Sequence, residues 1–197
     1  PVKNIDVNGD SIWYTRNGDI VTMHVTAKIF NNSSDNINMA RAAKDIVSDI
    51  KSTYEGKFEW SDNKTYNLKV DMDLKVATSM KDVENSDHLF VLADSDSKGA
   101  RGATSMLGGK VMTLASSDFA NNNWLSNNLS YNKTFTATHE FGHAIGLSHS
   151  QNPFNIMKQG GVVHNSNSNQ RVIMLQQQNN LNNNLVVDIY NLGLKWR

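Results

Sequence analysis

The chain of 197 residues is 39% hydrophobic and 19% charged, so it can bury one core but is too short for two full-sized domains. Basic and acidic residues both number 19, and no apolar run approaches the about 18 residues of a membrane span, which argues against nucleic-acid and membrane partners. Cysteine is absent, which excludes disulfides and thiolate chemistry and leaves His, Asp and Glu to hold any metal.

The N-terminal part of the chain predicts a hairpin of two strands. Residues Ser11–Arg16 form the first strand, and Asn17-Gly18 supplies the positive φ angles of a tight turn. From Ile20 to Phe30 apolar residues occupy every second position, which is the pattern of a strand with one buried face.

A helix and two further strands follow the hairpin. Apolar residues recur at three- and four-residue steps from Ile37 to Ile50, which predicts an amphipathic helix that stops near Gly56. Strict alternation predicts a strand over Tyr66–Val76, and the short apolar run His88–Ala93 predicts another. The order strand, helix, strand, strand implies a sheet that contains parallel pairs.

The second half of the chain predicts another hairpin and two helices. Arg101–Met106 and Lys110–Ala115 are interpreted as short strands joined by a Gly-Gly turn. Helical patterns run from Tyr131 to Leu147 and around Gln170–Leu181, whereas the pattern of the tail, 185–197, favours no element type.

Half of the six histidines lie in one short segment. On a helix, His139 and His143 are one turn apart on the same face, so both imidazoles can reach one cation, and Glu140 lies beside them. Gly146 lets the helix end in a sharp turn, after which His149 can return as a third ligand.

This arrangement leaves the fourth coordination position open, as in catalytic rather than structural zinc sites. Zinc acidifies its water and polarises a carbonyl, while a nearby carboxylate accepts the proton and passes it to the leaving amine. Glu140 is the predicted carboxylate. Two histidines four residues apart are often only a surface pair, but all five fixed positions coincide by chance with a probability on the order of 10⁻⁵.

The segment His139-Glu-Phe-Gly-His-Ala-Ile-Gly-Leu-Ser-His-Ser150 resembles the zinc signature of the metzincins, His-Glu-x-x-His-x-x-Gly-x-x-His. Its wording is most similar to the matrixin form, because a serine follows the third histidine. The resemblance implies a turn methionine that packs beneath the zinc, and Met157 lies eight residues after His149. Without that context, a lone methionine is interpreted as ordinary core packing.

The resemblance implies an α+β fold for the whole chain: a metzincin-like catalytic domain with a twisted mixed sheet, a backing helix, an active-site helix and a C-terminal helical subdomain. Residues 1–197 would then form one domain, with an upper part of about 1–147 and a lower part of about 148–197. In matrixins the edge strand binds substrate backbone as an added antiparallel strand, and by position this strand is Arg101–Met106. The residues expected to face the cleft are Gly102, Ala103, Thr104 and Ser105.

Two further cation sites were considered. Matrixins have a second, structural zinc held by His and Asp, but the corresponding region here has only His88, Asp94 and Asp96, so we expect one catalytic zinc and no second ion. The pattern Asp94-x-Asp96-x-Lys98-Gly99 resembles a calcium loop. Because Lys98 takes a ligand position and no glutamate follows at the required spacing, calcium is the weaker alternative.

We predict a monomeric zinc endopeptidase that hydrolyses peptide bonds in extended protein segments, and the resemblance implies secretion. One alternative is a zinc amidase or peptidase toxin module, part of a larger secreted polypeptide, that acts on a non-protein amide or a cell-wall peptide. Another is a catalytically silent binding module that keeps zinc as a scaffold. The presence of Glu140 argues against a silent site, because structural zinc does not require it.

Overall fold

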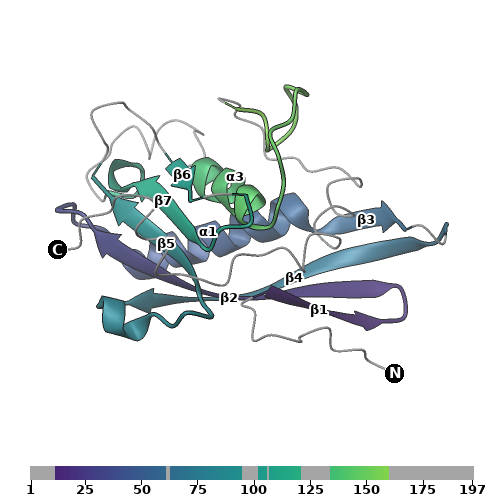
Figure 1. The fold of residues 1–197 in the computed structure, drawn as a ribbon, viewed down its shortest axis with the longest axis horizontal. Coiled ribbons are helices and arrows are strands. Elements are labelled where there is room, and N and C mark those ends of the chain that lie inside the picture. The colour runs from purple at the N-terminus through teal and green to yellow at the C-terminus, as the bar shows by residue number, and fades with distance from the viewer. Residues whose placement is uncertain (1–11, 61–62, 95–101, 106, 121–133, 160–197) are drawn as a thin grey trace.

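The computed structural model describes residues 12–60, 63–94, 102–105, 107–120 and 134–159. These residues form a curved mixed sheet with two helices on one of its faces (Figure 1). No helix within these segments is long and apolar enough to cross a membrane. The arrangement is the α+β fold expected from the sequence.

The N-terminal hairpin consists of β1 (Ile12–Asn17) and β2 (Ile20–Asn32), which pair antiparallel. Its turn lies one residue later than predicted, because Asn17 pairs with Ile20 and remains in the strand. Gly18 has a φ of 63°, whereas Asn17 does not adopt a positive φ. A glycine at the first central position is typical of a type II′ turn, while the predicted Asn-Gly turn needs positive φ at both central residues.

Helix α1 (Met39–Tyr54) confirms the predicted amphipathic helix. It begins after Asn38, whose side chain accepts a hydrogen bond from the Arg41 amide at 3.0 Å and so satisfies one of the first free amides. The side chains on its buried face are Ala42, Ala43, Ile46, Ile50, Thr53 and Tyr54. This face packs against the sheet and brings Tyr54 beneath the second helix, α3 (Phe135–Ala144).

The parallel pairs expected from the element order are present. Strand β4 (Thr65–Ala77) lies parallel to β2 along one edge, and β5 (His88–Ala93) lies parallel to the second half of β2 along the other edge, beyond β1. A short strand that was not predicted, β3 (Gly56–Glu59), pairs antiparallel with β4. Four residues are too few to display an alternating pattern.

The predicted second hairpin is also confirmed, with shorter strands. Strand β6 (Gly102–Thr104) pairs antiparallel with β7 (Val111–Ala115), and β7 lies parallel to β5. The order across the sheet is β3-β4-β2-β5-β7-β6, with β1 paired beside β2. Among the described strands, β6 is therefore the edge strand next to the second helix.

Strand β5 is buried on both faces. One face joins the main core, and the other forms a separate cluster in which Leu89 and Val91 pack with Val111. Met80 and Val83 cover this second cluster from the connection between β4 and β5. Burial on both faces explains why β5 has a continuous apolar sequence instead of an alternating one.

His88, the first residue of β5, is completely buried. Burial lowers its pKa to about 3, and the nearby charge of Lys110 acts in the same direction. In the unfolded chain its pKa is about 6.5, so below that pH the unfolded state binds a proton that the folded state excludes. The contribution of neutral His88 to stability is fully present above about pH 6.5 and is lost as the pH falls. We expect protonation of His88 in the unfolded chain to lower the free energy of unfolding by about 2 kcal/mol between pH 7 and pH 5.

Urea unfolding at pH 7 and pH 5 measures this loss in the wild type and in His88→Gln. The variant should lose less stability on acidification than the wild type, by about the amount attributed to His88. His24→Gln is the matched control, because His24 lies on the outer face of the sheet, where it bonds to Asp71. Equal losses in the wild type and His88→Gln would contradict the prediction.

The C-terminal part of the chain lies beyond the described residues, which end at 159. The predicted helix Gln170–Leu181 and the tail 185–197 both fall there, as does most of the lower part from residue 148. The C-terminal helical subdomain and the division of residues 1–197 into two parts therefore stay predictions.

Candidate metal centre

Helix α3 (Phe135–Ala144) confirms the helical pattern around the histidines, but it ends three residues before Leu147. Its end is a Schellman motif: the amide of Gly146 donates to His143 O at 3.0 Å, and the amide of Leu147 donates to Gly142 O at 2.8 Å. Gly146 has a φ of 91°, which a residue with a Cβ rarely adopts. The turn predicted at Gly146 therefore exists and redirects the chain toward His149.

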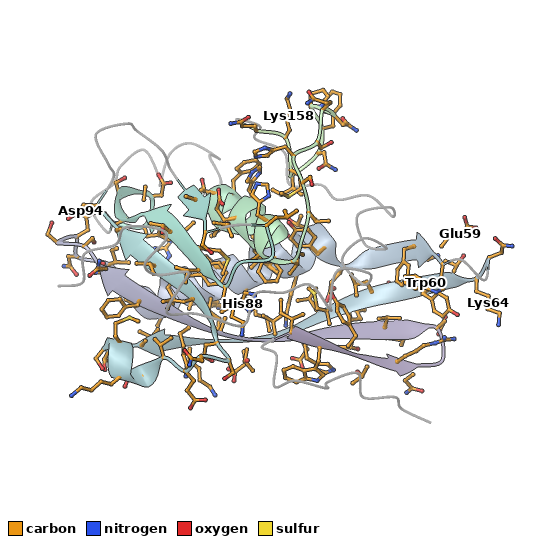
Figure 2. The ribbon with its side chains drawn as sticks, in the orientation of Figure 1. Glu59, Trp60, Lys64, His88, Asp94 and Lys158 are labelled. Carbon is orange, nitrogen blue, oxygen red and sulfur yellow. The ribbon has the colours of Figure 1, made fainter. Side chains whose placement is uncertain are left out.

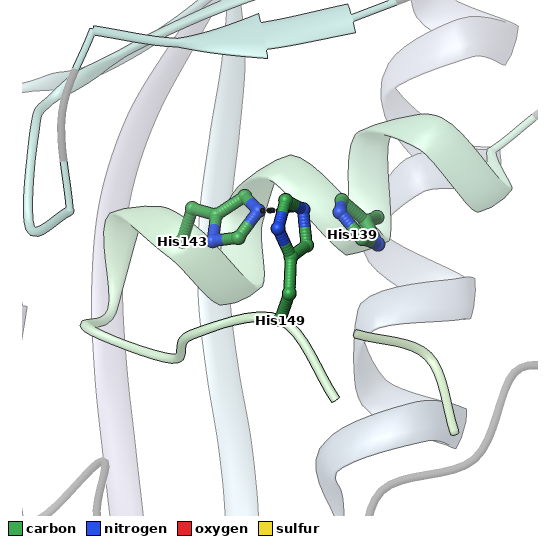
Figure 3. Close-up of side chains that lie close together, drawn as sticks. All are labelled: His139, His143 and His149. Carbon is green, nitrogen blue, oxygen red and sulfur yellow. Dashed lines mark hydrogen bonds between the residues drawn. The ribbon is translucent and has the colours of Figure 1, made fainter. Parts of the chain in front are cut away.

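The side chains of His139, His143 and His149 point toward one another (Figure 3). One ring nitrogen of each lies within 4.8 Å of the others, and Nε2 of His143 is 3.2 Å from Nε2 of His149. Two nitrogen ligands of a tetrahedral zinc are about 3.4 Å apart. The pair His143–His149 matches this distance, and the wider separations, up to 4.8 Å, require the rings to move slightly closer around a single ion. Exposure increases from buried His139 to exposed His149, so solvent reaches one side of the group.

Backbone carbonyls fix the orientation of two rings. Nδ1 of His139 donates to Ile156 O, and Nδ1 of His143 donates to Leu147 O, both at 2.7 Å. A carbonyl only accepts hydrogen bonds, so each Nδ1 carries the proton and each Nε2 has a lone pair for a metal. Burial lowers the pKa of both rings, which favours the neutral form that binds metal. The residues present therefore fit a zinc ion.

Glu140 is buried beside the histidines. Burial raises the pKa of its carboxyl group, while hydrogen bonds from Thr104 and the neighbouring His143 and His149 act in the opposite direction. Thr104 Oγ1 donates to Glu140 Oε2 at 2.7 Å, so a residue of the edge strand contacts the predicted general base. This contact joins β6 to α3.

Met157 is fully buried beneath α3. Its thioether lies against Gly142, where an added Cβ would overlap with Sδ, and Tyr54 Oη lies 3.8 Å from the same sulfur. Tyr54 also donates to Thr138 O at 2.9 Å, and burial raises its pKa, so it stays a donor. The position beneath the histidine helix is the one expected of a turn methionine; its supporting role stays a prediction.

The edge strand presents its residues on alternating sides. Gly102 and Thr104 lie against α3, where both contact Glu140, whereas Ala103 is exposed and Ser105 is half-buried. Substrate contact through the backbone of these residues stays a prediction.

The other candidate cation ligands do not join the histidine group. Figure 2 shows His88 and Asp94 at opposite ends of β5, and Asp94 accepts hydrogen bonds from the amide and hydroxyl of Ser34. The rest of the suggested calcium loop, from Asp96 to Gly99, lies outside the described residues. Within the described segments, the three histidines are the only metal-binding group of three or more side chains that the structure brings together.

Two residues of the site have no signal in the sequence motif. Tyr54 comes from the last turn of α1, and Thr104 comes from the edge strand. Both reach α3 across long separations in the chain, so local spacing does not reveal them. The signal in the sequence is a hydroxyl-bearing residue at a position that the pattern predicts to be packed against another element.

The sheet, the backing helix and the histidine helix together define a metzincin-like catalytic domain, the fold of a class of zinc metallopeptidases. The sequence model of the matrixin family, peptidase M10, matches residues 14–179, which is most of the chain. The chain thus belongs to the matrixin family of zinc metallopeptidases. The resemblance noted in the sequence is confirmed.

The solved structures to which the chain is similar are distant. Metalloproteinase-II from Bacteroides fragilis is 14% identical, with a TM-score of 0.44 over 77% of this chain and 52% of that chain. This chain thus spans about half of that protein's length. Archaemetzincin from Methanopyrus kandleri is 15% identical, with a TM-score of 0.39 over 86% of this chain and 97% of that chain. No curated protein sequence matches the chain.

Proposed function

We propose that the chain is a zinc-dependent endopeptidase that hydrolyses peptide bonds in extended protein segments. One observation carries the proposal: three histidine nitrogens converge beside the carboxylate of Glu140, which itself contacts the edge strand. Membership of the matrixin family supports zinc peptidase chemistry. The resemblance to matrixins also supports action outside the cell, and we propose that the chain acts as a monomer.

Each residue has a role in this proposal. His139, His143 and His149 hold the zinc, and bound zinc supplies Lewis acidity that acidifies water and polarises a peptide carbonyl. The Glu140 carboxylate accepts a proton from the attacking water and then gives it to the leaving nitrogen. Met157 packs beneath the histidine helix and does not bind the metal.

The edge strand suggests how a substrate binds. Among the described strands, β6 pairs only with β7. Its other edge can therefore pair with an extended peptide. A substrate in that position would run beside α3, where Glu140 lies against Gly102 and Thr104. Backbone pairing favours extended segments over folded domains.

Digestion of an unfolded casein and of a peptide with acetylated and amidated ends tests the proposal. The zinc-loaded chain should cleave both at internal bonds, because an endopeptidase does not need free termini. 1,10-Phenanthroline should abolish cleavage, and added zinc should restore it, since the histidine group binds the metal reversibly. Mass spectrometry of the fragments locates the cleaved bonds.

The alternatives give different outcomes when a cell-wall peptide is digested beside these two substrates. Cleavage of cell-wall peptides alone would contradict a protein substrate and favour the amidase or toxin module. Stoichiometric zinc without hydrolysis of any substrate would favour the silent scaffold. Cleavage that persists in the chelator would contradict a zinc mechanism.

A further inference from the structure

We propose that Thr104 is a positioning residue that fixes the Glu140 carboxylate for proton transfer; this inference rests on the proposed function. Thr104 Oγ1 lies 2.7 Å from Glu140 Oε2 and 3.0 Å from Glu140 O. The hydroxyl has one proton to donate, and the carboxylate oxygen is both closer and the stronger acceptor, so the proton points to Oε2. The hydrogen bond therefore restricts rotation of the Glu140 carboxylate.

Gly102 confines the same carboxylate from a second direction. A Cβ at Gly102 would lie 3.0 Å from Glu140 Cγ and 3.1 Å from Glu140 Oε1, and would overlap with the Thr136 methyl group. The strand thus lies directly against the Glu140 side chain, with one oxygen above Gly102 and the other bonded to Thr104. Residues 102 and 104 share this face because side chains alternate along a strand.

This geometry couples substrate binding to the general base. The strand expected to pair with substrate is the strand that fixes Glu140, so ordering of β6 by a bound peptide would also order the carboxylate. The Thr104 hydroxyl, which is turned toward Glu140, can then influence kcat without itself contacting the substrate. The effect should appear in kcat and leave KM nearly unchanged.

The test compares Thr104→Val, which keeps the shape and removes the hydroxyl, with Thr104→Ser, which keeps the hydroxyl. We expect kcat on the blocked peptide to fall about 10- to 100-fold in Thr104→Val, with KM and zinc content close to wild type. Thr104→Ser should restore most of the rate. Thr113→Val is the matched control, because Thr113 Oγ1 in the neighbouring strand has no hydrogen-bond partner among the described residues.

A second readout does not depend on turnover. Acetohydroxamic acid binds zinc and needs a nearby carboxylate to accept its acidic proton, so its affinity should fall in Thr104→Val and recover in Thr104→Ser. Thr104→Ala serves as the second variant if the valine prevents folding, which thermal melting reports. An inactive wild type would contradict the proposed function, while the acetohydroxamate series would still decide the role of Thr104.

Three outcomes would overturn the inference. The first is a wild-type kcat in Thr104→Val, and the second is an equal loss in Thr104→Val and Thr104→Ser, which would indicate a merely structural effect. The third is an acetohydroxamate affinity that does not change with the hydroxyl. If the wild-type kcat of the first outcome came with a raised KM, Thr104 would act in substrate binding instead.

Discussion

Replacing Glu140 with Ala is expected to lower kcat by about 10²- to 10⁴-fold, the range in which positioned acid–base groups contribute to catalysis. The variant loses the group that, in the proposed function, moves the proton from water to the leaving nitrogen. Zinc content should stay at the wild-type level, because the rings of His139 and His143 are oriented by Ile156 O and Leu147 O. Initial rates on the blocked peptide and atomic absorption measure the two quantities.

Glutamine at position 140 separates the loss of the negative charge from the loss of side-chain volume. Glu140→Gln keeps the shape but cannot accept the proton, so its kcat should fall as in Glu140→Ala. Glu55→Gln is the matched control, since the Glu55 carboxylate accepts a hydrogen bond from the Val70 amide at 3.1 Å, away from the histidines. Retained activity in Glu140→Ala would show that another group transfers the proton. A loss of bound zinc in the same variant would show that Glu140 is a metal ligand.

Replacing Gly142 with Ala is expected to destabilise the fold by about 1–3 kcal/mol, as overpacking of a filled core does. The added Cβ would overlap with Met157 Sδ and lie 2.5 Å from Tyr54 Oη. Alanine has the higher helix propensity by about 1 kcal/mol, so the overlap must exceed this gain. Because Ile156 O orients His139, displacement of Met157 should also weaken zinc binding. Urea unfolding and competition with a chelator measure both effects.

Two comparisons isolate the overlap. Gly18→Ala places a strained residue in a turn where the new Cβ meets no atom within 4 Å, so stability should fall while zinc affinity stays unchanged. In a double-mutant cycle, Met157→Ala should make the Gly142→Ala change less costly, because the two side chains compete for one space. Greater stability of Gly142→Ala with wild-type zinc affinity would contradict the argument.

The elements with long periodic patterns were predictable from the sequence. Helix α1 and strands β2 and β4 each repeat their pattern over several turns or pleats, and their parallel order follows from the crossover. The errors are local. The turn at Gly18 moved by one residue, and β3 was missed because its pairing with β4, rather than its own composition, makes it a strand.

The candidate site was predictable only where it is local. The spacing of His139, His143 and His149 on a helix and a glycine turn determines their convergence. The carbonyl groups that orient the rings belong to the backbone, so the residue types in the sequence do not reveal them. The contacts of Tyr54 and Thr104 depend on how α1 and β6 pack against α3, which is a property of the whole sheet.

The metal group and the proposed acid–base group differ in what they require of folding. The three histidines lie within residues 139–149, so bringing them together closes only a short loop and costs little chain entropy. The hydrogen bond between Thr104 and Glu140 spans 36 positions and needs the β6–β7 hairpin in place. A partly unfolded chain could thus hold zinc without an ordered Glu140, so zinc content alone does not measure the fraction of competent enzyme.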